Sequence, residues 1–200
     1  MTAHHCVVKI EMARNYTLKR RAESQAETRR RIVEAAVELH STVGPANTTV
    51  SMIADKAGVQ RHTLYKHFPD ERSIAMACSG QVQERDPLPD AEAWRAVADP
   101  AERLRVGLRA IYAWFERNEG LLACVLRDAE HYELVREISA LRYAPGIAKW
   151  HEVLGSALNA KQRPMLSLAL SYHTWRTLTR EGGLKQPDAV KAMVKAIHAG

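Results

Sequence analysis

Residues 48–74 read TTVSMIADKAGVQRHTLYKHFPDERSI, and this stretch decides the fold of the N-terminal part of the chain. A threonine at its start can cap the free amides of a short helix over residues 50–57. Gly58 then permits a tight turn, and Pro69 ends a second short helix over residues 60–67. Two short helices joined by a glycine turn are typical of the helix-turn-helix motif.

The second of these helices carries mostly polar side chains. Leu64 and Phe68 are one helical turn apart and are expected to be buried. A helix with exposed donors at its N-terminal end can enter the major groove of DNA, where Arg pairs with guanine and Gln with adenine. The alternative is an ordinary solvated face. As a set, the polar residues favour DNA contacts: to bases from Gln60, Arg61, His62 and Thr63, and to phosphates from Tyr65, Lys66 and His67.

The segments upstream of this motif differ in pattern. Residues 25–43 have apolar residues at the spacing of one buried helical stripe, and Gly44 and Pro45 are expected to end this helix. Residues 1–24 show no sustained periodicity and are expected to form a flexible, basic arm, within which Met12 could be the native start. The stripe consists of Ile32, Ala36, Leu39 and Val43.

The sequence over residues 28–75 closely resembles the DNA-binding signature of the TetR family of transcriptional regulators. The resemblance implies a three-helix DNA-binding domain over residues 25–75 and a helical ligand-binding and dimerisation domain over residues 76–200. It also implies DNA contacts from Thr49 and Ser51. The matching positions are Thr49-Val50, Ile53-Ala54, Ala57-Gly58-Val59, Thr63-Leu64-Tyr65 and His67-Phe68.

One position departs from the family pattern. The family usually has a lysine that reaches a phosphate where this chain has Glu71. A carboxylate repels the DNA backbone, so either Arg72 replaces the missing contact or DNA affinity is lower. The sequence leaves both possibilities open.

The C-terminal two thirds of the chain show helical patterns and no strand pattern, so the expected fold class is all-α. One helix is expected to end at Pro145, and another to run from Pro164 to Gly182. In the resembled family the last two helices pair across a two-fold axis, which implies a homodimer. The alternative is that their apolar stripes close the core of the monomer. Arg127 and Asp128 fall in a charged segment expected at the surface or between domains.

The resemblance also implies a cavity for a small-molecule effector. With few charges placed to line it, an apolar or aromatic effector is favoured. The alternative for each aromatic is ordinary core packing. The candidate residues are Trp114, Cys124, Trp150, His151, Tyr172, His173 and Trp175.

Composition agrees with a DNA-binding protein without proving one. The chain has 200 residues, 46% hydrophobic and 26% charged, and its net charge of +6 suits a polyanionic partner. Three cysteines, far apart, fit a reducing cytoplasm better than a disulfide framework. No stretch predicts a signal peptide or a membrane span.

No motif predicts an enzyme, a cofactor or a metal centre. A nucleophile elbow, a phosphate-cradling glycine loop and metal-ligand spacings are missing from the sequence. Cys124 and His131 could in principle meet as a nucleophilic pair, but no signature supports it. The run His4-His5-Cys6 lacks a second ligand cluster. A DNA-binding regulator is therefore the favoured function.

Overall fold

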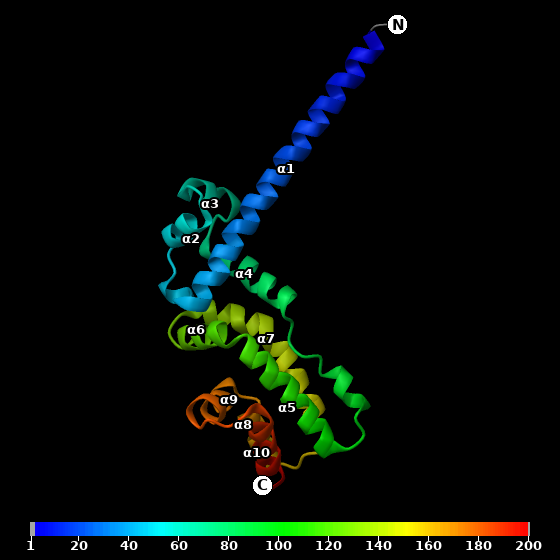
Figure 1. The fold of residues 1–200 in the computed structure, drawn as a ribbon, viewed down its shortest axis with the longest axis vertical. Helices are drawn as coiled ribbons and strands as arrows, with labels where there is room; N and C mark the ends of the chain where they lie inside the picture. Colours follow the sequence, from blue (N-terminus) through cyan, green and yellow to red (C-terminus); the bar gives the residue numbers. More distant parts are fainter. Residues whose placement is uncertain (1–2, 200) are drawn as a thin grey trace.

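The computed structural model describes residues 3–199, with side chains described for Tyr16 and residues 18–199. Within that range the chain is helical and has no strand, which confirms the expected all-α fold (Figure 1). None of its helices is long and apolar enough to cross a membrane. The elements are α1 (Ala3–Thr42), η1 (Pro45–Asn47), α2 (Val50–Ala57), α3 (Arg61–His67), α4 (Glu71–Arg85), η2 (Glu92–Ala96), α5 (Pro100–Arg117), α6 (Glu119–Ala129), α7 (Glu133–Leu154), α8 (Gln162–Ala169), α9 (Tyr172–Arg176), the π-helical turn η3 (Thr177–Glu181) and α10 (Gln186–Ala199).

The N-terminal head is formed by α1, α2 and α3, which pack around one apolar core. Ile32 and Ala36 of α1 meet Ile53 of α2, and Leu64 and Phe68 close the core from α3 and its C-terminal end. Each of these five side chains is at most 3% exposed. The spacing of the α1 residues therefore predicts its buried face correctly up to Ala36.

The linking helix α4 crosses the boundary predicted at residue 75. Its buried residues Ile74, Cys78 and Val82 recur every four positions and belong to the core of the head. The head thus extends about two helical turns beyond the expected boundary.

The C-terminal body is built around α5, which lies between α7 and α10 (Figure 1). The predicted stripe of α5 is confirmed, because Leu104, Leu108, Ile111 and Phe115 are all buried. They join a second apolar cluster, separate from that of the head, to which α7, α8, α9 and α10 contribute.

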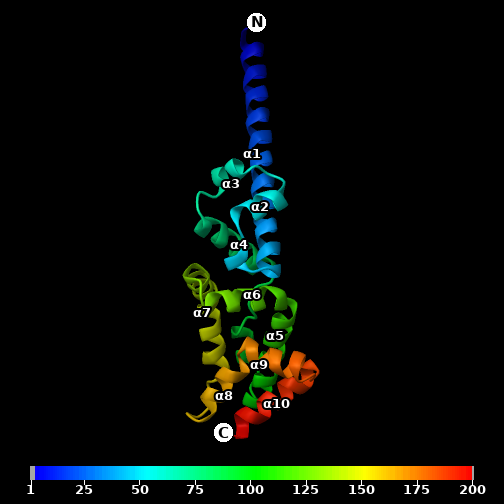
Figure 2. The same ribbon diagram turned by 90° about the vertical axis from the view of Figure 1, so that its left-hand side faces the viewer.

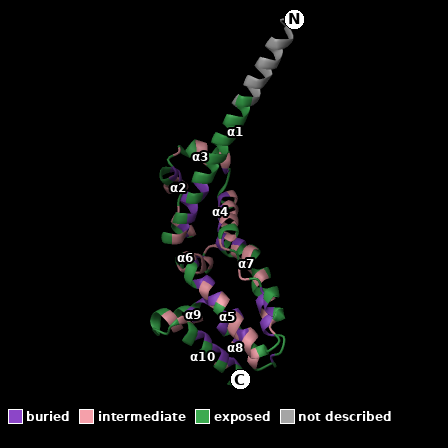
Figure 3. Cartoon of the chain, turned by 45° about the vertical axis from the view of Figure 1, so that its right-hand side comes forward, coloured by how far each residue is buried: buried purple, intermediate pink, exposed green. Residues whose placement is uncertain are grey.

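The expected N-terminal arm is helical in the structure. α1 begins at Ala3 rather than near residue 25 and projects from the head away from the body (Figures 1 and 2). The sequence holds no Gly or Pro before Gly44, so nothing interrupts the helix. The expected boundary instead marks where packing begins: the described side chains up to Glu27 are exposed, and Ile32 is buried (Figure 3).

Two predicted helix boundaries in the body are wrong. Pro145 lies inside α7 instead of ending it. The helix expected from Pro164 to Gly182 is divided at Leu170 and Ser171, so that α8 and α9 are separate elements. The sequence there carries no Gly or Pro as a signal of the break.

The apolar stripe of the last helix closes the body's own core. Ala189, Val190, Met193, Val194 and Ile197 of α10 are buried within the single chain, against α5 and α8. The residues that α10 leaves exposed are mainly polar. The alternative that this stripe serves the monomer is therefore the one that the structure favours.

The head and body meet where α1 ends. Gly44 has a φ of +95°, and a side chain there would collide with Arg127 and Asp128 of α6. The Arg127 guanidinium donates to the Val43 carbonyl at 3.0 Å, and the Ala46 amide donates to the Asp128 carboxylate at 2.9 Å. Glycine is therefore required here both by the backbone conformation and by the close approach. The charged pair that the sequence placed at the surface or between domains lies at the domain junction.

Candidate nucleic-acid interface

The turn between α2 and α3 has the geometry of a helix-turn-helix. The Thr49 hydroxyl accepts a hydrogen bond from the Met52 amide at 3.2 Å and caps α2, as predicted. Gly58 ends α2 in the left-handed conformation, with a φ of +64°. The Val59 amide then returns to the Ala54 carbonyl at 3.0 Å, which closes the turn.

Helix α3 buries one side and leaves the predicted donors on the other. Leu64 is fully buried and Phe68 is 1% exposed, as their spacing indicates. Ser51 at the start of α2 is half-buried and Thr49 is exposed. The predicted base-contacting and phosphate-contacting residues all belong to this motif and none is buried: Gln60, Arg61, His62, Tyr65 and Lys66 are exposed, and Thr63 and His67 are half-buried.

Two arginines of α1 pack against this motif. Arg29 lies over the Phe68 ring, with its guanidinium carbon 4.1 Å from the ring centre, and donates to the His67 carbonyl at 3.2 Å. Arg31 donates to the Ala57 carbonyl at 3.1 Å. Both cations therefore meet the carbonyl ends of short helices, where positive charge is favourable. Helical spacing places both arginines off the buried stripe of α1 and does not reveal these contacts.

The start of α4 faces the body. Arg72 makes a two-pronged ion pair with Glu137 of α7, at 2.7 and 2.9 Å. Burial and then a hydrogen bond to Glu71 raise the pKa of Tyr132 to about 12. The ion pair with Glu137 occupies Arg72, the side chain that the sequence names as a possible substitute for the missing lysine.

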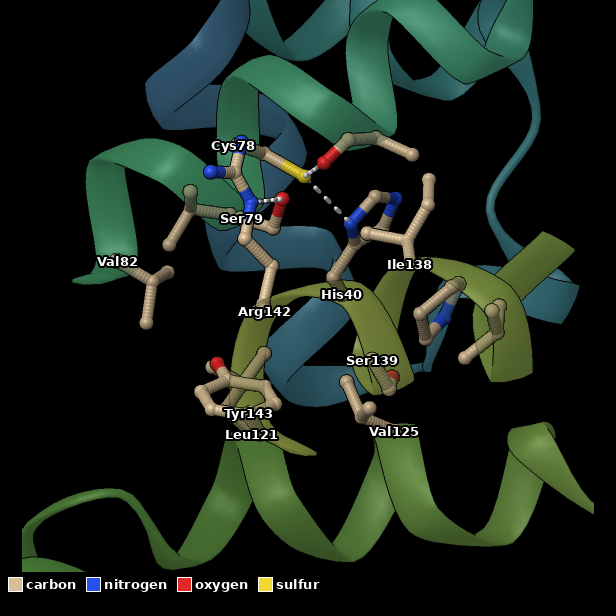
Figure 4. Close-up of a pocket in the computed structure, with 14 residues that line it drawn as sticks. His40, Cys78, Ser79, Val82, Leu121, Val125, Ile138, Ser139, Arg142 and Tyr143 are labelled. Atoms are coloured by element: carbon tan, nitrogen blue, oxygen red, sulfur yellow. Dashed lines mark hydrogen bonds between the residues drawn. The ribbon is translucent and has the colours of Figure 1, made fainter. Parts of the chain in front are cut away.

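A buried polar pair that the sequence did not single out lies between head and body (Figure 4). The Cys78 sulfur is 3.3 Å from Nδ1 of His40. Burial lowers the pKa of His40 to about 4 and raises that of Cys78 to about 12, so both groups are neutral near pH 7. Arg142 lies beside them and donates to Ser79 and to the Met76 carbonyl. His40 falls on the stripe of Ile32 and Ala36, which is the signal that could have placed it in the core.

This pair borders a small cavity of about 60 Å³ between α1, α4, α6 and α7. Its walls are mainly apolar, and four of their polar side chains interact in pairs, His40 with Cys78 and Arg142 with Ser79 (Figure 4). The cavity is large enough to hold water.

A larger cavity lies within the body, between α5, α6, α7 and the start of α9. Its volume is about 370 Å³ and its walls are mostly apolar. Trp114 meets both Tyr143 and Trp150 edge-on, with ring centres 6.0 and 6.5 Å apart. Of the predicted ligand-binding residues, the structure brings four to this cavity: Trp114, Trp150, Tyr172 and His173.

The other three predicted ligand-binding residues lie elsewhere. Cys124 is buried beside the Thr42 carbonyl at the domain junction. His151 faces a separate surface depression near α8. Trp175 is fully buried in the core, with the Arg180 guanidinium 4.9 Å from its ring centre. Core packing, the alternative weighed for each aromatic, accounts for Trp175.

The candidate catalytic pair has separate partners in the structure. Cys124 contacts the Thr42 carbonyl, whereas His131 is exposed beside Glu130. Within the described side chains, no group of three or more His, Cys, Asp or Glu is placed to hold a metal. The run from His4 to Cys6 lies outside those side chains.

Comparison with known sequences supports the interpretation of the head. The model of bacterial regulatory proteins of the tetR family matches residues 32–78. The HTH-type transcriptional regulator SrpR of Pseudomonas putida is 35% identical over 85 residues, which are 40% of each chain. The HTH-type transcriptional regulator TtgR, also of Pseudomonas putida, is 32% identical over 96 residues, 48% of this chain and 46% of TtgR. The chain thus spans less than half the length of these two relatives.

Other similarities extend over the body. The regulator TcmR of Streptomyces glaucescens is 25% identical over 194 residues, 86% of this chain and 80% of TcmR. The structure of NalD, the secondary repressor of the MexAB-OprM multidrug efflux pump in Pseudomonas aeruginosa, has a TM-score of 0.61 at 22% identity, over 89% of this chain and 97% of NalD. The regulator PfmR of Thermus thermophilus has a TM-score of 0.58 at 23% identity, over 84% of this chain and 97% of PfmR. At these identities the structures show a shared fold.

Proposed function

The chain belongs to the TetR family of bacterial regulatory proteins, and we propose that it is a homodimeric transcriptional repressor that binds a palindromic operator and is released by a small molecule. The observation that carries this proposal is the exposed polar face of α3. This helix belongs to a motif with a threonine cap and a glycine turn, at the end of the molecule away from the body (Figure 1). Its place of action is the cytoplasm, where bacterial DNA lies.

In this proposal α3 enters the major groove with its N-terminal end. Gln60, Arg61, His62 and Thr63 then lie nearest the base edges, where Arg can donate two hydrogen bonds to guanine. Thr49, Ser51, Tyr65, Lys66 and His67 lie along the groove walls and bind phosphates.

The short length of α3 favours a dimer. α3 has only seven residues and can contact few base pairs. Two heads about 34–36 Å apart would read two half-sites one helical turn apart, and so a palindrome. Since the stripe of α10 is used inside the monomer, the dimer contact proposed for the C-terminal helices falls to exposed residues of α8 to α10, such as Leu168 of α8, which is 52% exposed.

The aromatic cavity in the body is the proposed effector site. Its apolar walls and the edges of Trp114, Trp150 and Tyr172 favour an apolar or aromatic molecule, which His173 can orient by a hydrogen bond. Asp, Glu, Lys and Arg do not line the cavity, so a charged effector is not favoured. The alternative is a regulator of the same fold that acts without a small ligand.

Selection of genomic fragments by the purified protein tests the proposal. An enriched palindrome supports a dimeric sequence reader, and the genes beside it indicate the class of effector. If nothing is enriched, the selection is repeated with Glu71→Lys, which restores the family's lysine. Recovery of a palindrome would show a weakened reader, whereas continued failure would contradict DNA reading by this chain.

A second experiment addresses the effector. Compounds that release the selected duplex are compared between the wild type and Ala144→Trp, which adds a large side chain at the wall of the cavity. An effector that binds there releases the wild type but not the variant, provided that the variant still binds the duplex. If no apolar or aromatic compound releases the wild type, the alternative without a ligand is favoured.

A further inference from the structure

The part of α1 that projects from the head is a charged surface with no role in the DNA contacts proposed above. From Tyr16 to Glu27 the described side chains are exposed, and the first partly buried one is Thr28. In both Figures 1 and 2 this segment leaves the molecule at the head end, opposite to the body. It therefore extends the same end of the molecule that carries α3.

Three successive cations, Lys19, Arg20 and Arg21, form the basic cluster of this segment. At about 100° per residue their side chains spread over roughly 200° of the helix circumference, so they present positive charge in most directions. Arg30 differs, because it is held between the carboxylates of Glu27 and Glu34, at 2.7 and 2.5 Å.

The position of the basic cluster relative to α3 is set by Arg29. Arg29 contacts the C-terminal end of α3, at His67 and Phe68. The cluster lies eight to ten residues before Arg29, which is about 12–15 Å along the helix axis. DNA has one base pair per 3.4 Å, so along a duplex this distance equals roughly four base pairs.

We propose that Lys19, Arg20 and Arg21 bind the phosphate backbone of the duplex outside the half-site that α3 contacts. The interaction is between an exposed basic helix and a polyanion, which needs no fixed side-chain geometry and releases counterions from the DNA. The inference rests on the proposed function, since it assumes that α3 is seated on DNA. It adds a second DNA-contacting element, which raises affinity without reading bases.

The test compares the salt dependence of operator binding between the wild type and the triple variant Lys19→Gln, Arg20→Gln, Arg21→Gln. Gln is a good helix former, and circular dichroism checks that helix content is kept. Each phosphate contact adds about 0.9 to the slope of log affinity against log salt, so the variant is expected to lose about 2–3 from the slope.

Two controls separate this from a general effect of charge. The variant Arg109→Gln, Lys161→Gln, Lys185→Gln removes three exposed cations of the body that lie outside α8, α9 and α10, and should keep the wild-type slope. The duplex is also shortened, from flanks of about 10 base pairs, one helical turn, to flanks of about two. On the short duplex the wild type and the α1 variant should have the same slope.

Each outcome decides between the claims. Binding by the wild type with an equal slope for the α1 variant on the long duplex overturns this inference and leaves the proposed function standing. Equal losses for both triple variants also overturn it, because the effect would then be one of net charge. If the wild type prefers no duplex sequence at all, the proposed function fails and this inference with it.

Discussion

The guanidinium of Arg72 donates hydrogen bonds to both carboxylate oxygens of Glu137, at 2.7 and 2.9 Å, and so links the first turn of α4 to α7. Each partner shifts the other's pKa, raising that of Arg72 and lowering that of Glu137. The side chain that the sequence proposes as a substitute for the missing lysine is therefore held by a carboxylate of the body. If Arg72 is that substitute, phosphate and Glu137 would compete for it.

Replacing Glu137 by Gln should strengthen DNA binding, because Arg72 becomes available to the backbone. The pair is exposed, so we expect roughly a two- to five-fold gain in affinity. Glu133→Gln is the matched control, since it removes a carboxylate one turn earlier on α7 that pairs with Arg136. Fluorescence anisotropy on the selected duplex measures both. Equal gains from the two variants would mean that only net charge matters.

Arg61→Ala should lose about 1–3 kcal/mol of binding free energy to the operator and relax the preference for one base pair. Arg61 is exposed at the start of α3, the end of the helix that the proposed function places in the major groove. Lys66→Ala, further along α3, should instead weaken binding to all duplexes similarly and reduce the salt slope by about one. A competition assay with single-base operator variants distinguishes them. If both variants weaken every duplex equally, Arg61 does not read a base.

Gly44→Ala should destabilise the protein by more than Gly183→Ala. Both glycines have a positive φ, of +95° and +68°, so an alanine strains the backbone at either position. Such strain costs about 1–3 kcal/mol. Only at Gly44 does the added carbon also meet neighbours, the side chains of Arg127 and Asp128; at Gly183 it meets nothing within 4 Å. Thermal denaturation of the two variants should therefore show the lower midpoint for Gly44→Ala, and equal midpoints would contradict the close packing at the junction.

Stability should fall as the pH is lowered, in part because of His40. Burial lowers its pKa from 6.5 to about 4, against the opposing effect of Glu71 and Asp128. Because the folded pKa is below the unfolded one, the unfolded chain takes up the proton first, and stability is lost as the pH falls from about 6.5 to about 4. Between pH 7.5 and pH 5, His40 should lower the free energy of unfolding by about 2 kcal/mol.

Urea denaturation of the wild type and of His40→Gln at the two pH values measures this contribution. The variant cannot take up that proton, so its stability should fall by about 2 kcal/mol less over the same interval. A parallel fall in both proteins would mean that His40 does not carry the pH dependence.

The elements of the head follow from local signals, which is why the sequence predicts them well. A threonine cap, a glycine with positive φ and a helix-period stripe each act within a few residues. The extent of α1 was missed because amphipathic spacing reports where a helix packs and not where it ends. Before residue 25 nothing packs against the described side chains, so the pattern is lost although the helix continues.

In the body the errors concern contacts between segments far apart in the sequence. Pro145 is accommodated within α7, and the break between α8 and α9 has no turn residue to signal it. The pairing of Arg72 with Glu137 joins residues 65 positions apart. No local pattern encodes such a pair, so the sequence could propose a DNA contact for Arg72 but not reveal its ion pair with Glu137.

The measurement that tests the account most directly is the ratio of dissociation constants for the selected palindrome and for a scrambled duplex of the same composition. It is made with the whole chain at near-physiological salt, where non-specific binding is weak. A sequence-reading dimer predicts a ratio of about 1,000 or more in favour of the palindrome. Equal affinities that both vanish by about 200 mM salt would show a basic protein that binds DNA by charge alone, and would contradict the account.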